Sequence, residues 1–93
     1  MKKLLGIGAV DNSKQNDWQI FPNPFFNTIQ FASEELVNSE LMVYDVNGNC
    51  VLNHSFVSNY ETVSGLSHLA NGIYLISISK SGKVIYSTAV VKK

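Results

Sequence analysis

The residues of this chain that could do chemistry are few and widely spaced. Cys50 and His54 are four positions apart, so they would share one face of a strand. The rise per residue nevertheless separates them by about 13 Å, too far for a thiol–imidazole hydrogen bond. The pattern favours a buried cysteine beside polar strand residues. Cys50 is also the only cysteine, which excludes an internal disulfide and a thiolate zinc cage. His68 stands in a predicted turn, where we expect it to be solvated.

Ser67 lies in a segment that begins like the nucleophile elbow of a hydrolase, Gly65-Leu66-Ser67-His68-Leu69. The elbow needs a second glycine two residues after the serine, on a turn from a strand to a helix. Leu69 occupies that position and a strand is predicted to follow, so Ser67 is interpreted as a turn residue. We therefore expect no enzyme activity. A small hydrolase fragment is the least favoured function, because a nucleophile–base pair is missing.

Asp45 admits two interpretations. It ends an apolar strand just before Asn47-Gly48, where a carboxylate can accept backbone N–H bonds and hold a turn. Asp45, Asn47 and Asn49 also match the opening of a calcium loop, but the downstream acid of that loop is missing. The two histidines and the scattered carboxylates show no other metal-ligand spacing. The structural role is favoured, and we expect no metal and no cofactor.

Composition indicates one small folded domain. The chain has 93 residues, of which 45% are apolar and 11% aromatic, with seven basic and seven acidic side chains and no net charge. The basic residues are all lysines and form no stripe, which argues against a nucleic-acid partner. No apolar run approaches the roughly 20 residues of a membrane span. Residues 1–17 are predicted to be a linker or fragment start, with a signal-peptide remnant as the alternative, and residues 18–93 to be the domain.

The elements that must position these residues are predicted to be strands, because no ten-residue stretch keeps a helical period. The first strand begins at Trp18 and is interrupted by Pro22 and Pro24, so we expect an edge strand that leaves its sheet at Asn23. A loop is favoured over residues 32–39. Further strands are predicted at 28–31, 41–46, 50–56, 60–63, 73–79 and 84–91. These six or seven short, mainly antiparallel strands fit an immunoglobulin-like β-sandwich, an all-β fold.

Two local patterns refine this prediction. Asn47-Gly48 lies between apolar runs and predicts a hairpin closed by a type I′ turn. Tyr74 follows Asn71-Gly72 at the start of a strand. It fits either a tyrosine corner, in which the hydroxyl bonds to upstream backbone, or an ordinary strand aromatic. Ser81-Gly82 is predicted to turn the chain into its last strand.

Three elements together are similar to one known family. They are Phe21-Pro22-Asn23-Pro24-Phe25, Val43-Tyr44-Asp45-Val46-Asn47-Gly48, and Leu69-Ala70-Asn71-Gly72-Ile73-Tyr74 with the terminal Val90-Val91-Lys92-Lys93. Their order and spacing resemble the type A C-terminal sorting domain of the type IX secretion system of Bacteroidetes-type bacteria, over about Trp18 to Lys93. Each motif alone is a weak indication of this family, whereas the three together are quite specific for it. The departure from the family is that only residues 1–17 precede the motif, with no cargo domain.

The resemblance implies a secretion signal without catalysis. It implies a preceding cargo protein, passage through the periplasm and outer membrane to a secreted or cell-surface location, and partners among the translocon and sortase components. Cleavage by the sortase would fall before Trp18. Val90 to Lys93 are the expected recognition residues. The terminal strand, Val84 to Lys93, offers unpaired backbone groups for β-augmentation by a partner, or for an edge-strand dimer. The alternative is an immunoglobulin-like adhesion or carbohydrate-binding module, with Trp18, Tyr60 and Phe25 as candidate aromatics.

Overall fold

Residues 18–93 are described by a computed structural model, and the predicted linker over residues 1–17 lies outside the described residues. The described part consists of strands, turns and loops. The strands are β2 (Gln19–Phe21), β3 (Ile29–Ala32), β4 (Glu40–Tyr44), β5 (Cys50–Ser55), β6 (Tyr60–Val63), β7 (Gly72–Lys80) and β8 (Lys83–Lys92). The predicted all-β class is confirmed. No helix long and apolar enough to cross a membrane is found in residues 18–93.

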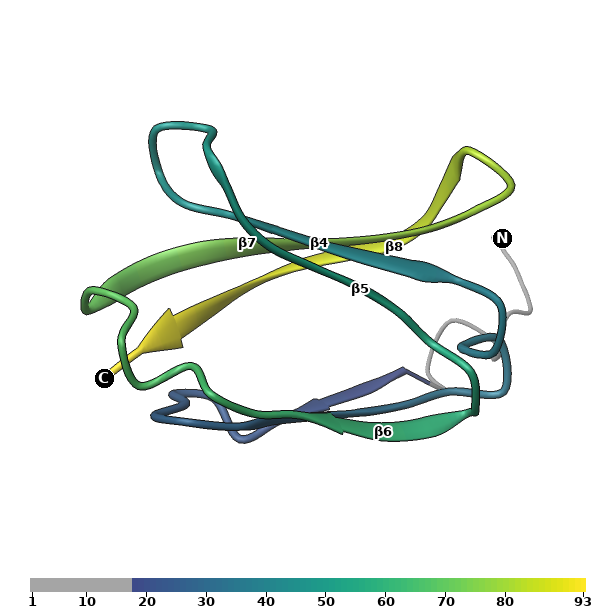
Figure 1. The fold of residues 1–93 in the computed structure, drawn as a ribbon, viewed down its shortest axis with the longest axis horizontal. Coiled ribbons are helices and arrows are strands. Elements are labelled where there is room, and N and C mark those ends of the chain that lie inside the picture. The colour runs from purple at the N-terminus through teal and green to yellow at the C-terminus, as the bar shows by residue number, and fades with distance from the viewer. Residues whose placement is uncertain (1–17) are drawn as a thin grey trace, which may run out of the picture.

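The strands form two layers that face each other (Figure 1). One sheet has the order β5-β4-β7-β8 and the other the order β2-β3-β6, and every neighbouring pair is antiparallel. β2 lies at a sheet edge, as its prolines predict. β8, the last strand, lies at the edge of the four-stranded sheet. The chain is therefore a β-sandwich with seven strands in residues 18–93.

The core lies between the two sheets and follows the period-2 pattern of the strands. Along β7, Tyr74, Ile76 and Ile78 are buried, whereas Leu75 is 48% exposed on the outer face. This alternation confirms the predicted facing of the strand. The core consists of Phe25, Ile29, Phe31, Leu36, Leu41, Val43, Phe56, Val63, Leu66, Tyr74, Ile76, Ile78 and Val90.

The two hairpin turns differ from each other. The β4–β5 hairpin forms where predicted, but its turn is not type I′, because Gly48 alone has positive φ (85°). Asp45 N–H donates to Asn49 O and Gly48 N–H to Asp45 O, which is a type I turn followed by a left-handed glycine. The type I′ geometry occurs between β7 and β8 instead, where Ser81 and Gly82 have φ of 54° and 78°.

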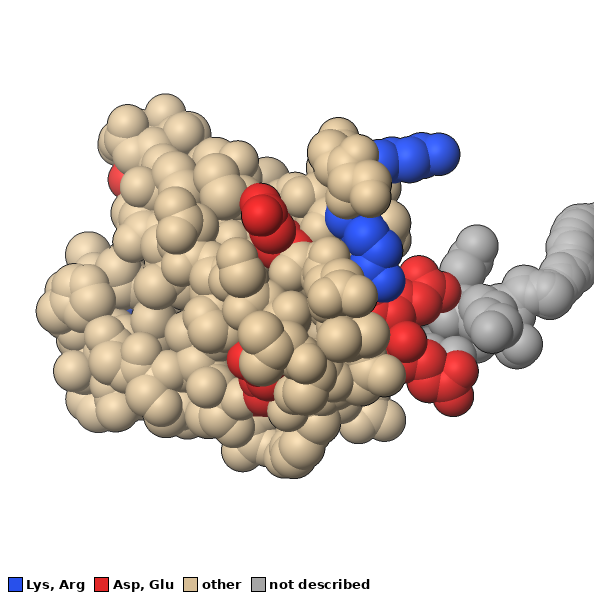
Figure 2. Space-filling model, turned by 45° about the vertical axis from the view of Figure 1, so that its right-hand side comes forward, with Lys and Arg blue, Asp and Glu red and all other residues tan. Residues whose placement is uncertain are grey.

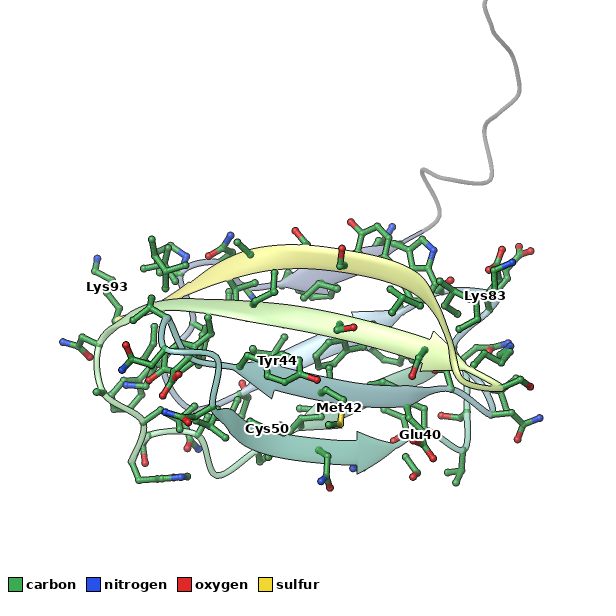
Figure 3. All side chains as sticks on the ribbon, turned by 90° about the horizontal axis from the view of Figure 1, so that it is seen from above. Glu40, Met42, Tyr44, Cys50, Lys83 and Lys93 are labelled. Carbon is green, nitrogen blue, oxygen red and sulfur yellow. The ribbon has the colours of Figure 1, made fainter. Side chains whose placement is uncertain are left out.

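Cys50 is exposed, so the prediction that it is buried is wrong. The reason is the strand register, which pairs Cys50 with Tyr44 across the β4–β5 hairpin. Leu41 and Val43 face the core, so Met42 and Tyr44 face outward, and Cys50 lies beside them on the outer face of the four-stranded sheet (Figure 3).

Figure 2 shows the charged side chains on one face of the described residues. Lysine and acidic side chains lie close together at its right-hand end, and further acidic side chains lie over its middle and at its left-hand edge. Lys83 and Lys93 mark the two ends of β8 (Figure 3). The far end of this strand, at Lys93, is where the resemblance puts the recognition element.

Candidate functional site

The predicted recognition residues alternate between the two sides of β8. Val90 and Lys92 are 2% and 3% exposed, whereas Val91 is 39% exposed and Lys93 is also exposed. Val90 belongs to the core. Because successive side chains of a strand point to opposite faces, Val91 and Lys93 are the two that can touch a partner directly.

Lys92 is a buried lysine with a defined environment. Its Nζ lies 4.8 Å from the centroid of the Phe26 ring and donates to Lys93 O at 3.3 Å. A cation over an aromatic face is stabilised by the quadrupole of the ring, and more strongly so where water is excluded. Lys92 therefore holds the end of β8 against the loop after β2. The sequence contains no spacing that would indicate the contact with Phe26.

The Pro22-Asn23-Pro24 motif forms a latch on the end of β8, and we call residues Asn23 to Phe25 the latch segment. Phe25 N–H donates to Val91 O at 2.8 Å and Lys93 N–H donates to Phe25 O at 2.9 Å, in a parallel bridge. The side-chain oxygen of Asn23 accepts the Val91 N–H at 2.9 Å. The chain thus leaves the three-stranded sheet after β2 and reaches the edge of the other sheet at Phe25, which ties the two sheets together at this corner.

Asp45 holds the β4–β5 turn, as its structural interpretation predicts. Its Oδ1 accepts the N–H groups of Asn47 and Asn49, both at 2.9 Å, and its Oδ2 accepts Asn49 Nδ2 at 3.3 Å. These bonds, foremost that from the Asn49 backbone, lower the pKa of Asp45 below its ordinary value. Within residues 18–93, no group of three or more His, Cys, Asp or Glu is placed to hold a metal ion.

Tyr74 forms a tyrosine corner, which decides between the two interpretations of this residue. Its hydroxyl donates to Ala70 O at 2.6 Å, and its ring is buried with an edge contact to Phe25 at 6.2 Å between centroids. Gly72, with φ of 144°, leads the chain into the strand. The corner fixes the loop before β7, as in immunoglobulin-like sandwiches.

A second polar contact joins the two sheets and is not evident in the sequence. His54 on β5 lies 2.9 Å from Glu61 on β6, between His54 Nε2 and Glu61 Oε1. Glu61 Oε2 accepts the N–H groups of Val57 at 2.6 Å and Ser58 at 2.9 Å in the connecting loop. The bond from His54, then those from the loop, lower the pKa of Glu61. His54 and Glu61 meet because the chain crosses from one sheet to the other between β5 and β6.

The candidate aromatics of the carbohydrate-binding alternative do not form an exposed platform. Phe25 is buried in the core. Trp18 is half-buried and stacks on Tyr86, with 4.7 Å between ring centroids and 6° between planes. Tyr60 is 60% exposed, and its hydroxyl donates to Gln30 Oε1 at 2.6 Å. Phe25 and Trp18 are thus packing residues. His68 and Ser67 are exposed turn residues, also as predicted.

The sandwich and the tyrosine corner define the class of this protein as a small immunoglobulin-like β-sandwich module. Its sequence matches the family of secretion system C-terminal sorting domains over residues 19–92, and the chain belongs to that family. It is a sorting domain of the type IX secretion system, which targets a cargo protein for secretion and is not catalytic.

Comparison with solved structures agrees with this fold. The domain is similar to a part of PorZ, described as an essential bacterial surface component of the type IX secretion system of Porphyromonas gingivalis. The TM-score is 0.67 at 15% sequence identity, and the match covers 87% of this chain and 12% of PorZ. The chain therefore spans a small share of that protein, and the likeness concerns the fold. No protein with a curated description matches the sequence.

Proposed function

We propose that residues 18–93 carry a preceding cargo protein through the outer membrane by binding translocon components. A sortase at the cell surface then removes the domain by cutting within residues 1–17, which serve as the linker. The cargo is thereby released from the cell or stays on its surface. Membership of the sorting-domain family supports this proposal. Val90, Val91, Lys92 and Lys93 form the recognition element.

The observation that carries the proposal is the position of β8. It is an edge strand of the four-stranded sheet, so one side of its backbone is not paired with a neighbouring strand over most of its length. At its end, Val91 and Lys93 present side chains to solvent, while Val90 and Lys92 hold the strand in place from inside. A partner can thus recognise this end of the domain without unfolding it.

The test is export of a reporter fused ahead of Trp18 in a bacterium with a functional type IX system. We expect the wild-type fusion to reach the medium or cell surface, and a fusion lacking Val90 to Lys93 to stay in the envelope. Because that deletion removes the buried Val90, point variants separate recognition from folding. Val91→Ser and Lys93→Ala alter only outward-facing side chains and are expected to lower export.

Matched controls make the same changes elsewhere on the surface. Val57→Ser lies in the β5–β6 loop, at a side chain that is 81% exposed, and Lys83→Ala lies at the other end of β8. We expect export at the wild-type level from both. Continued export of the fusion without Val90 to Lys93 would show that the terminal strand is not the recognition element.

A further inference from the structure

The backbone of β8 has an open segment whose position is set by the latch. Val91 donates its N–H to Asn23 and accepts the N–H of Phe25, so both of its backbone groups point away from β7. In an antiparallel pair, residues alternate between facing the neighbour and facing away from it. The unbroken register from Val91 back to Ser87 therefore directs the N–H and C=O of Ser87 and Ala89 to the free edge.

Within residues 18–93, Ser87 to Ala89 pair with β7 on one side, and no strand lies along their other side. Within residues 18–93, no hydrogen bond is made to the N–H of Ser87 or Ala89, and both residues are exposed. Natural edges are usually blunted by lysine, proline or a bulge. Ser87, Thr88 and Ala89 are none of these, and the irregularity of the β7–β8 pair lies earlier, opposite Ile78 and Ser79. This part of the edge has none of the features that usually prevent an edge strand from pairing with another chain.

The surface beside the open edge is apolar. On the outer face of the four-stranded sheet, Ile73, Leu75 and Val91 are 56%, 48% and 39% exposed, although outward positions of such a sheet are ordinarily polar. Ala89 is paired with Leu75 and is also exposed. A strand added at Ser87 to Ala89 would place alternate side chains next to this apolar surface.

The latch shows which kind of occupant this edge accepts. Phe25 already pairs with the end of β8 as an extended residue, in parallel orientation. Pro22 and Pro24 lack N–H groups, and the chain before them pairs with β3, so the latch does not extend toward Ala89. The latch thus fills the edge at Val91 and Lys93 and leaves the edge before it empty.

We propose that Ser87 to Ala89 is a β-augmentation site for an extended polypeptide segment of the secretion machinery, with apolar side chains toward Leu75 and Val91. This inference rests on the proposed function and makes it specific. The partner adds its strand upstream of the latch, and Val91 and Lys93 contribute side chains only.

The test uses proline at the open edge, within the same reporter fusion. Ser87→Pro and Ala89→Pro each remove an N–H that faces the free edge and leave the bonds to β7 intact. We expect the exported fraction to fall about tenfold, the factor that corresponds to one lost backbone hydrogen bond.

The matched control is Asn53→Pro on β5, the opposite edge of the same sheet. Phe56 N–H donates to Ser39 O, so by alternation the N–H of Asn53 also faces its free edge. This variant is expected to be exported like the wild type. If thermal unfolding shows that the prolines unfold the domain, Ser87→Lys against Asn53→Lys makes the same comparison with the backbone intact.

The outcomes separate this inference from the proposed function. Export of Ser87→Pro and Ala89→Pro at the wild-type level would overturn the augmentation site and leave the sorting function standing. A dimer in solution that Ser87→Pro abolishes, without loss of export, would assign the edge to a second copy and overturn the proposed partner. Failure of the wild-type fusion to be exported would reject the proposed function itself, and this inference with it.

Discussion

At the scale of single residues, the terminal motif divides into side chains that hold the strand and side chains that can meet a partner. Val90 fills the core and Lys92 places its ammonium over Phe26, whereas Val91 and Lys93 face outward. A motif that looks uniform in sequence therefore combines two roles, and substitutions within it should separate export from stability.

Tyr74→Phe tests the tyrosine corner. The change removes the bond from the hydroxyl to Ala70 O and leaves the buried ring in place, so we expect the free energy of unfolding to fall by about 1–2 kcal/mol. Tyr60→Phe is the matched control, because it also removes a 2.6 Å hydrogen bond, but from an exposed ring. Denaturant unfolding of both variants measures the difference. Equal stability of the two would mean that the corner contributes nothing beyond an ordinary surface bond.

Glu61→Gln tests the contact between β5 and β6 through its pH dependence. The folded-state pKa of Glu61 lies below its ordinary value of 4.5. The contribution of the carboxylate is therefore complete above that value and is lost as the pH falls through the lowered pKa. We expect the variant to be less stable than wild type by about 1 kcal/mol at neutral pH. The gap should narrow on acidification below pH 4.5.

Melting temperatures across that pH range, with Glu34→Gln at an exposed carboxylate as the control, measure this effect. A constant gap between wild type and Glu61→Gln at all pH values would show that the charge of Glu61 does not stabilise the fold.

At the scale of elements, the latch explains how the end of β8 is held on the side that has no neighbouring strand. An edge strand is paired with another strand on one side only. Here β8 is paired with β7 on one side, and its last residues are held on the other side by Asn23 and Phe25. The latch also decides which part of the β8 edge is free for a partner.

Asn23→Ala is expected to loosen the latch without unfolding the domain. The side-chain acceptor of the Val91 N–H is lost, so the amide of Val91 should exchange with solvent about tenfold faster in a hydrogen-exchange experiment. Asn27→Ala is a reciprocal control, because the Asn27 side chain accepts the N–H of Ser67 instead. In that variant Ser67 should exchange faster and Val91 should not. Unchanged protection of Val91 in Asn23→Ala would contradict the role given to Asn23.

At the scale of the whole molecule, local sequence patterns predict most of the fold. Alternation in β7, the Asn-Gly hairpin and the prolines of the first strand each predicted an element that the structure contains. The prediction of a type I′ turn at Asn47-Gly48 was wrong. The Asp45 carboxylate and the three-residue loop 46–48 favour a type I turn instead. The exposure of Cys50 was missed, because it depends on the register of the hairpin.

The long-range contacts of the site had no local signal at all. The latch joins Asn23 to Val91, the cation–π contact joins Phe26 to Lys92, and His54 meets Glu61 across the two sheets. Periodicity and turn residues report on neighbours along the chain, whereas these contacts depend on how two sheets close over each other. The resemblance to a family predicts recognition at Val90 to Lys93, and the structure shows which of these side chains are exposed.

We propose that the β-sandwich of residues 18–93 is by itself a sufficient secretion signal. The most direct measurement fuses a fluorescent reporter ahead of Trp18 and compares the fraction outside the cell in a strain with a working type IX system and in one lacking its outer-membrane translocon. We expect the reporter outside the cell in the first strain and retained within the envelope in the second. Retention in both strains, with the domain folded, would contradict the claim.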